Sequence, residues 1–448
     1  MEGKMIYLLL LLIIMLFLLA FFTSKEDILA PSVIVCLMWM FSTICAIYNV
    51  DNWGVNLHSN TIEVIVIGLL SFIVGGWIGS NMPTITYCKK TKRKVSKERA
   101  KLSVISVWKP VLIFLIIINC LTVALQLKWV LSQVGSISTW SETMTAYRSG
   151  SSSWNTDSVS KPSMLSNMEI LLQITAYMMT YIGINNIFAE KKIKRNLLCF
   201  IPGILFAVDK IFNAGRGDIL LYIGAIMLTV YICMQTKYEW RKQISRKYIK
   251  YMLIAVVLVT VLFSVSRSWV GRTNESGMLE YVTTYAGGSI QLFDLYMQDP
   301  ETPSNIFGKE TFHTLINYLG KKLNHPEWQY IAHLEFRYSN GVNLGNVYGA
   351  FRYYLYDFGL TGVIVLSCLA AVFYSYMYRH IQTMKLTSAD GFSWKVLVYM
   401  YFAPSLFMFS IADYTYALLF NFVALIKWFV LAWFIKRLLV NRNFPVKI

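Results

Sequence analysis

One short segment combines an arginine with glycines and an acidic residue. Arg216 stands between two glycines and is followed closely by Asp218. Glycine lets the backbone approach a ligand, and the planar guanidinium of arginine bonds two phosphate oxygens at once. If the preceding helix continued, Asp209, Asn213 and Arg216 would share one face, and Asp218 would cap the next helix. The segment predicts a phosphate grip; the alternative is a tight turn whose arginine reaches lipid headgroups.

Two further arginines, Arg267 and Arg272, follow an apolar run that ends at Ser266. They stand where the chain would leave the bilayer on its outer side, against the usual bias of basic residues toward the cytoplasm. Their forked side chains suit a diphosphate. The alternative is again an anchor for lipid headgroups.

The long polar segment from residue 267 to residue 357 contains the residues that could move protons. General acid–base catalysis needs a carboxylate or a histidine within hydrogen-bond reach of the proton. The histidines are spaced too irregularly to predict a metal site. The candidate ionisable residues are Glu275, Glu280, Asp294, His313, His325, His333, Glu335, Arg337 and Arg352.

Membrane-spanning helices would position these residues. The chain has 448 residues, 56% hydrophobic and 15% charged, with a mean hydropathy of +0.51. Soluble globular proteins average about 45–50% apolar and about 25% charged residues, so a water-soluble multidomain enzyme is excluded. A helix needs about 20 apolar residues to cross a bilayer. We predict eleven spans, over residues 5–22, 28–48, 61–80, 110–127, 168–188, 197–212, 219–234, 251–266, 358–378, 396–411 and 416–435.

Basic residues predict the orientation of these spans. Four clusters fall on one side of an eleven-span topology, at residues 89–101, 191–195, 237–250 and 436–447. Because lysine and arginine concentrate in cytoplasmic loops, that side is predicted to be cytoplasmic, with the N-terminus outside. The net charge of +17 is therefore interpreted as a topology signal, and nucleic-acid binding is not expected.

The predicted fold is an all-α polytopic membrane protein in three consecutive parts. Residues 1–266 hold eight spans with an outer loop at 128–167, residues 267–357 form a large extracytoplasmic loop, and residues 358–448 hold three spans. A loop of that length is too long for a passive connector, so we expect helices in it, for example over residues 278–296. None of the seven cysteines falls in an outer segment, so no disulfide is expected.

Five stretches carry a more specific pattern: residues 213–220, which open a span, and residues 307–312, 335–341, 346–349 and 357–362. Together with the many spans and the large outer loop late in the chain, they resemble bacterial oligosaccharide repeat-unit polymerases. These are the O-antigen or capsular polysaccharide polymerases, often called Wzy-type. The outer loop at 128–167 carries no such resemblance.

The resemblance implies a multi-pass glycosyltransferase of type C-like fold in the bacterial cytoplasmic (inner) membrane, with its active site facing outside. Its substrates would be oligosaccharide repeats on undecaprenyl diphosphate. The growing glycan would move onto the non-reducing end of a new lipid-linked repeat. No nucleotide sugar, metal or other cofactor is expected. A chain-length regulator and a flippase of the same pathway are candidate partners, beside the lipid bilayer itself.

The resemblance also suggests roles for individual residues. Fixed cations would stabilise the leaving diphosphate, and Glu335 is the preferred base because it lies in one of the five stretches, beside Arg337. The predicted diphosphate-binding residues are Arg216, Arg267, Arg272 and Arg337, and the predicted bases, in order of preference, are Glu335, Glu280, Asp218 and His313.

Three other functions remain open. An O-antigen ligase would use the same donor with a lipid A core acceptor. A polysaccharide flippase or other transporter should carry charged residues through several spans, whereas here they gather at the outer ends. A structural or signalling membrane protein would leave the large loop and its arginines unexplained.

Overall fold

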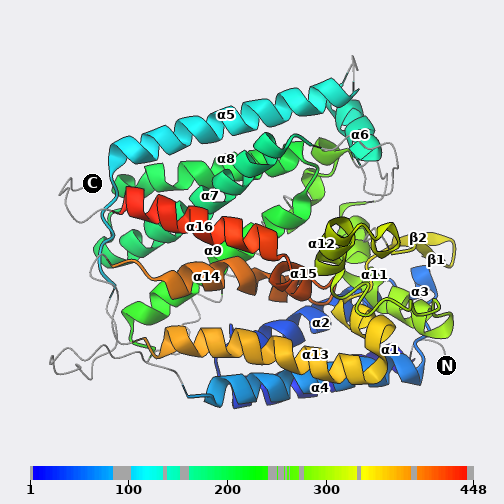
Figure 1. Cartoon of the computed structure of the whole chain (residues 1–448). Helices are drawn as coiled ribbons and strands as arrows, with labels where there is room; N and C mark the ends of the chain where they lie inside the picture. Colours follow the sequence, from blue (N-terminus) through cyan, green and yellow to red (C-terminus); the bar gives the residue numbers. More distant parts are fainter. Residues whose placement is uncertain are drawn as a thin grey trace. The chain divides into compact units, whose positions relative to one another are not determined.

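The computed structural model describes residues 4–83, 102–134, 139–151, 161–240, 250, 257, 260–261, 263–271, 277–329, 334–384 and 391–440, and most of them are helical (Figure 1). Among these residues, six helices are long and apolar enough to cross a membrane: α1 (Lys4–Thr23), α2 (Pro31–Tyr48), α4 (Ser59–Asn81), α5 (Lys109–Val134), α9 (Arg216–Lys237) and α13 (Ala350–Gln382). Each coincides with a predicted span. The coarse prediction of a helical membrane protein is therefore supported by length and composition.

The remaining predicted spans fall on other helices. They are α7 (Ser163–Glu190), η1 (Lys194–Phe200) with α8 (Ile201–Phe212), α14 (Trp394–Phe402) with η4 (Ala403–Met408), and α15 (Thr415–Leu419) with α16 (Phe422–Leu439). The eighth predicted span, residues 251–266, lies mostly outside the described residues. The count of eleven spans stays a prediction.

Contacts group the chain into two units, each assembled from non-consecutive segments. Unit 1 comprises Met1–Thr84, Ser276–Arg379 and Ser405–Phe422, and unit 2 comprises Ile85–Glu275, His380–Pro404 and Val423–Ile448. The sequence-based division followed chain order instead, because composition alone does not show which distant segments pack together.

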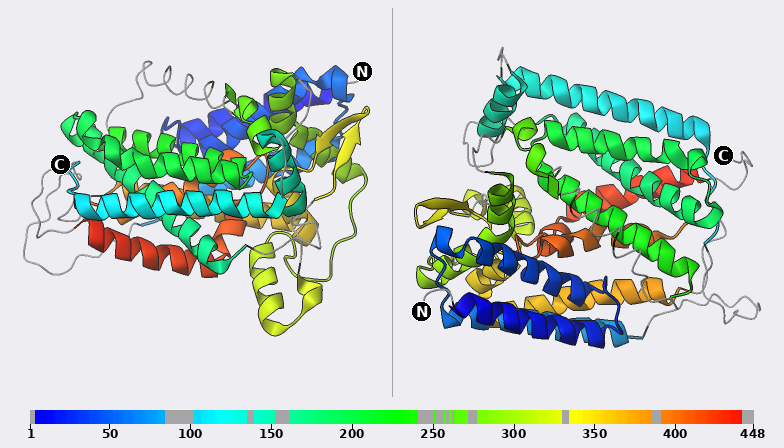
Figure 2. Two further views of the ribbon diagram at one scale, coloured as in Figure 1. Left: turned by 90° about the horizontal axis from the view of Figure 1, so that it is seen from above. Right: turned by 180° about the vertical axis from the view of Figure 1, so that it is seen from behind.

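Unit 1 is built on close packing between α4 and α13, which the views of Figure 2 show side by side. Three glycines of α4 face α13. A Cβ atom on Gly79 would lie 2.6 Å from the carbonyl oxygen of Val372, one on Gly75 would overlap Cys368, and one on Gly68 would meet the ring of Phe351. Small residues let two membrane helices approach closely.

The large loop contributes α11 (Met278–Gln298), α12 (His313–Leu323) and η3 (Pro326–Trp328) to the same unit. The helix expected over residues 278–296 is thus confirmed. It packs on α2, where a Cβ on Gly287 would lie 2.6 Å from the amide nitrogen of Ala46, and the hydroxyl of Ser42 donates to the carbonyl of Ala286. Part of the loop is therefore buried against a candidate span.

One hairpin departs from the all-α prediction. Strands β1 (Arg337–Ser339) and β2 (Val342–Gly345) pair antiparallel across Asn340 and Gly341. Both turn residues have positive φ angles, 48° and 76°, as a two-residue hairpin turn requires. Hydrogen bonds from Ser339 and Asn340 to backbone carbonyls of α3 (Val50–Trp53) fix the hairpin in place.

Unit 2 contains the helices α5, α7, α8 and α9, which lie side by side in Figures 1 and 2. It also holds α6 (Trp140–Ser151), η2 (Ser268–Val270), α14 and most of α16. Its core is aromatic: the ring of Tyr222 lies 5.2 Å from the rings of Tyr177 and Phe206, and Tyr401 lies 4.6 Å from Trp428.

Candidate functional site

In unit 1, the large loop meets the first turn of α13 around a buried arginine. The side chain of Arg352 is 1% exposed. Its Nη2 lies 3.4 Å from Oε1 of Glu301, and its Nη1 is paired with Oε2 of Glu310. Glu310 is buried as well, so each charge compensates the other away from water.

Three tyrosine rings surround the same guanidinium. Its central carbon lies 4.6 Å from the ring centre of Tyr296, 4.9 Å from that of Tyr356 and 5.7 Å from that of Tyr348. Burial raises the pKa of Tyr296 and of Tyr348, so both phenols stay neutral at physiological pH. A desolvated guanidinium over neutral aromatic faces is a favourable cation–π arrangement.

Arg337, at the start of β1, ties the hairpin to the end of α11. Its Nε donates to Oε1 of Glu335, its Nη1 donates to the carbonyl of Leu295 (2.5 Å), and its Nη2 donates to the carbonyl of Asp299 (2.6 Å). These bonds use three of the five N–H donors of a guanidinium.

Further hydrogen bonds join these two arginine sites. The hydroxyl of Tyr348 donates to the backbone carbonyl of Glu335 (2.9 Å). The carboxylate of Asp357 accepts from the backbone amides of Glu310 (3.1 Å) and Thr311 (2.7 Å). We call the assembly the arginine–tyrosine cluster, defined as Arg337, Arg352, Tyr296, Tyr348, Tyr356, Glu301, Glu310 and Glu335.

Two of the predicted site residues belong to this cluster, and two others of unit 1 do not. Glu335 and Arg337 are paired within it. His313, at the start of α12, places Nδ1 2.9 Å from the carbonyl of Glu310; burial lowers the pKa of His313 while Asp357 opposes the shift. Glu280 is exposed in the first turn of α11, sixteen residues before Tyr296. At 1.5 Å per residue this is about 24 Å along the helix, so Glu280 is not brought near Glu335.

Sequence reasoning gave Arg352 no specific role and did not connect it with its tyrosine partners. The one local signal was the four-residue spacing of Arg352 and Tyr356, which puts both on one face of a helix. The other partners come from distant parts of the chain, so no spacing rule could have found them.

In unit 2, the segment around Arg216 is a turn between two helices, so the helix does not continue through it as the shared face of Asp209 and Arg216 would need. Helix α8 ends at Phe212, Ala214 has a φ of 54°, and α9 begins at Arg216 with Gly215 as its N-cap. The expectations that Arg216 shares a face with Asp209 and that Asp218 caps the next helix were therefore wrong. Asp218 lies in the first turn of α9 and is exposed.

The side chain of Arg216 is directed into the protein interior. Its side chain is buried, its Nη1 donates to the carbonyl of Phe263 (3.2 Å), and its guanidinium lies 4.2 Å from the ring centre of Phe263. Arg216 therefore joins the start of α9 to the segment that precedes Arg267.

Asn213 is the centre of a polar network near the ends of α5, α7 and α8. Its side-chain amide donates to Oδ2 of Asp209 (3.2 Å) and to Oε1 of Glu169 (3.0 Å), and its Oδ1 accepts from Lys161 (2.5 Å) and Gln126 (2.9 Å). The expected contact between Asp209 and Asn213 is confirmed.

Lys210 adds a second cation to this network. Its Nζ lies 3.3 Å from Oδ2 of Asp209, and Asp218 is another of its charged neighbours. The three carboxylates Glu169, Asp209 and Asp218 thus outnumber the two lysines, Lys161 and Lys210.

The remaining predicted cations are less defined by the structure. Arg267 lies half-buried in a turn before η2, where its backbone amide donates to the carbonyl of Ser264 and its carbonyl accepts from Val270. Arg272 lies outside the described residues.

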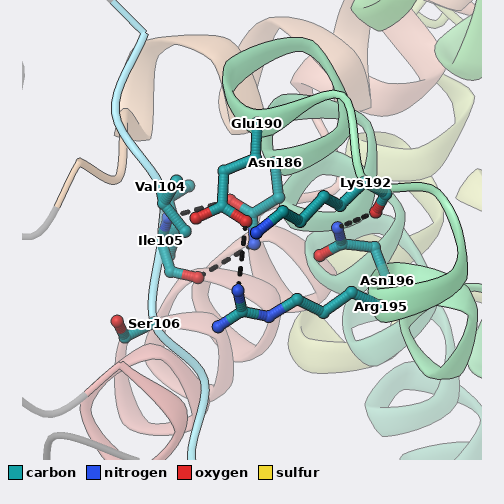
Figure 3. A pocket seen from close by; sticks show the side chains of 8 residues that line it. All are labelled: Val104, Ile105, Ser106, Asn186, Glu190, Lys192, Arg195 and Asn196. Atoms are coloured by element: carbon teal, nitrogen blue, oxygen red, sulfur yellow. Dashed lines mark hydrogen bonds and ion pairs between the residues drawn. The ribbon is translucent and has the colours of Figure 1, made fainter. Parts of the chain in front are cut away.

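A pocket of about 410 Å³ lies elsewhere in unit 2, between the segment before α5 and the end of α7 (Figure 3). In the lining of this pocket, the side-chain amide of Asn186 accepts a hydrogen bond from the backbone amide of Ile105 and donates one to the carbonyl of the same residue. Glu190 forms an ion pair with Arg195 at 3.4 Å. None of the predicted site residues lines it. It adjoins a basic cluster that the sequence assigns to the cytoplasmic side.

Within the described part of the chain, no group of three or more histidine, cysteine or acidic side chains is arranged to hold a metal ion. Comparison of the chain with models of protein families, with curated proteins and with solved structures gives no match.

Proposed function

We propose that this chain is a multi-pass glycosyltransferase that polymerises lipid-linked oligosaccharide repeats. The full proposal includes eleven spans, a type C-like fold, a site facing outward from the bacterial cytoplasmic (inner) membrane, and a product that is O-antigen or capsular polysaccharide. The growing glycan would leave undecaprenyl diphosphate and join the non-reducing end of a new lipid-linked repeat.

The observation that carries this proposal is the convergence of four of the five family-like stretches; the fifth, residues 213–220, lies in unit 2. Residues 307–312, 335–341, 346–349 and 357–362 are separate in sequence. Each nevertheless contributes a residue to the arginine–tyrosine cluster or bonds directly to it: Glu310, Glu335, Tyr348 and Asp357. Unrelated short resemblances would have no reason to meet in one place. The six apolar helices add the membrane setting that a lipid-linked substrate requires.

The chemistry of the cluster suits a reaction that releases a diphosphate. Negative charge develops on the leaving group as the anomeric bond breaks, and fixed guanidinium groups stabilise such charge. Arg337 is one of these guanidinium groups, and its partners within the protein hold it at the junction of the hairpin and the end of α11.

Deletion of the gene distinguishes this function from its alternatives. A polymerase mutant should accumulate a single lipid-linked or core-linked repeat. A ligase mutant should accumulate complete polymer that is not attached to lipid A core, and a flippase mutant should retain repeats on the cytoplasmic face. Purified protein supplied with the repeat isolated from the deletion strain should elongate it. Either of the other two glycan phenotypes would overturn the polymerase proposal.

We also expect elongation to survive chelation. Arginine side chains would do what a divalent metal does in nucleotide-sugar enzymes. The measurement is the elongation rate of purified protein in excess EDTA, compared with the same protein in buffer. Complete loss of activity that Mg²⁺ or Mn²⁺ restores would contradict an arginine-based site.

A further inference from the structure

A histidine outside the large loop faces a buried carboxylate at the end of α11. His58 is the residue immediately before α4. Its Nδ1 lies 3.0 Å from Oδ2 of Asp294, and the two side chains are 50% and 2% exposed. The partners are separated by 236 residues in the sequence, so the pair exists only in the folded protein.

Asp294 is held firmly and its two oxygens have different partners. Oδ1 accepts from the backbone amide of His58 (2.8 Å) and from the hydroxyl of Thr61 (2.6 Å), and so caps the start of α4. Capping alone needs only that oxygen. Oδ2 is left to accept a hydrogen bond from the imidazole of His58. To donate this bond, the neutral imidazole must carry its hydrogen on Nδ1. In that tautomer the lone pair on Nε2 can accept a proton, and the side chain of His58 is half exposed.

A comparison with another histidine shows what is distinctive here. His325 also lies near a carboxylate, with Nδ1 2.6 Å from Oε1 of Glu327. Glu327 is two residues away in the same short helical turn and is 59% exposed. It can move freely in solvent, whereas Asp294 is buried and fixed by three hydrogen bonds. Of these two histidines, only His58 has a buried carboxylate, held by hydrogen bonds, that fixes the orientation of its ring.

The His58–Asp294 pair lies within one helical turn of the arginine–tyrosine cluster. Asp294, Leu295 and Tyr296 are consecutive in α11. The first holds the imidazole, the carbonyl of the second accepts from Arg337, and the ring of the third lies under Arg352. The same short stretch of helix thus positions a potential base and both arginines.

We propose that His58 is the general base of the polymerisation reaction and that Asp294 is the residue that positions it. This inference rests on the proposed function. Nε2 of His58 takes the proton of the acceptor hydroxyl as that oxygen forms its bond to the anomeric carbon of the donor glycan. The bond from that carbon to the lipid diphosphate breaks, and the diphosphate leaves with the electron pair. The imidazolium, stabilised by Asp294, then returns its proton to solvent.

The experiment compares the elongation kinetics, kcat and KM, of wild type, His58→Gln, Asp294→Asn and His325→Gln. The probe is the lipid-linked repeat from the deletion strain. General-base catalysis contributes roughly 10²–10⁴-fold, so His58→Gln should lower kcat at least a hundredfold. His325→Gln should match wild type.

Asp294→Asn tests whether Asp294 orients the ring of His58 or only stabilises the fold. Asparagine retains a cap oxygen for α4 but presents an N–H to Nδ1, which favours the tautomer with hydrogen on Nε2. Its kcat should fall as well, with a thermal unfolding midpoint close to that of wild type.

The outcomes separate this inference from the proposed function. If wild type elongates and His58→Gln does so at the same rate, His58 is not the base and the polymerase proposal stands. If wild type fails to elongate the repeat, the polymerase proposal falls and the role of His58 falls with it. A low kcat in His325→Gln equal to that of His58→Gln would also overturn the assignment.

Discussion

Arg352 concentrates several interactions on one charged group. Its guanidinium pairs with Glu310 and Glu301 and lies over the ring of Tyr296. Removing one member of a buried ion pair typically costs about 3–5 kcal/mol, since the other charge stays behind without compensation. Replacing both members by neutral side chains costs less. Arg352 and Glu310 are therefore expected to depend on each other strongly.

A double-mutant cycle tests this dependence. Arg352→Met and Glu310→Gln should each lower the thermal unfolding midpoint of the purified protein, and the double variant should lose less than the sum of the two. Lys321→Met, on the exposed end of α12, is a matched control for loss of a cation and should change little. Additive losses in the double variant would show that the two charges are independent.

The contact of Arg216 with Phe263 is compatible with two roles for the arginine, a structural tie and a diphosphate ligand. As a structural tie, it needs one hydrogen bond to the carbonyl of Phe263 and a cation over the ring of that residue. Lysine could supply both. As a diphosphate ligand, it needs two parallel N–H bonds, which lysine lacks.

Arg216→Lys therefore separates these roles. If the guanidinium binds the donor diphosphate, both Arg216→Lys and Arg216→Ala should leave short or single-repeat glycans while the protein still accumulates in the membrane. The loss should be roughly 2–4 kcal/mol in transition-state stabilisation, on the order of a hundredfold or more in rate. Normal glycan chain lengths with Arg216→Lys would leave Arg216 only the structural tie.

At the scale of elements, α13 is interrupted where the large loop meets a candidate span. Gly359 has φ 62° and ψ −160°, a region that residues with a side chain almost never adopt. The break follows directly after Asp357 and Phe358. Asp357 bonds the amides of Glu310 and Thr311, and Phe358 packs 4.9 Å from the ring of Phe307. The interruption thus helps to connect the cluster to the span.

Gly359→Ala should destabilise the protein by about 1–3 kcal/mol through backbone strain. The expected result is a lower thermal unfolding midpoint, together with reduced elongation because the segment 307–312 loses its attachment. Gly150→Ala, whose added Cβ would have no neighbour within 4 Å, is the matched control and should be neutral or slightly stabilising. Equal midpoints for Gly359→Ala and wild type would mean that α13 can continue through this position.

The elements that sequence predicted well are those with a strong local signal. Long apolar runs gave α1, α2, α4 and α5, and apolar periodicity gave α11, because both signals lie within one segment. Two local signals were not given their full weight. Asn340-Gly341 is a favoured hairpin turn, and Gly215 favoured the tight turn that the sequence analysis kept as an alternative to a continued helix.

The site was less predictable because its contacts are not local. Arg337 and Glu335 were found since they are two residues apart. Arg352 pairs with Glu310 across more than forty residues, and His58 meets Asp294 across 236. Neither pair leaves a spacing pattern in the sequence. The fold places the start of α13 beside Glu310 and the residue before α4 beside the end of α11.

For the whole molecule, contacts within unit 1 constrain the topology. The short segment between α2 and α4 bonds the large loop at three places: Trp53 with Ser339, Asn52 with Asn340, and His58 with Asp294. These segments therefore lie at the same end of the unit. An eleven-span topology also assigns both of them to one side of the membrane, opposite the basic clusters.

Reporter fusions after Asn60, Lys101 and Glu327 test this arrangement. We expect an outer location for Asn60 and Glu327 and an inner location for Lys101, because positive charge is retained in the cytoplasm and because the first and third sites belong to segments joined by hydrogen bonds. Opposite locations for Asn60 and Glu327 would contradict the contacts of unit 1. If all three locations were reversed, unit 1 would keep its structure, but the arginine–tyrosine cluster would face the cytoplasm, where extracytoplasmic polymerisation could not occur.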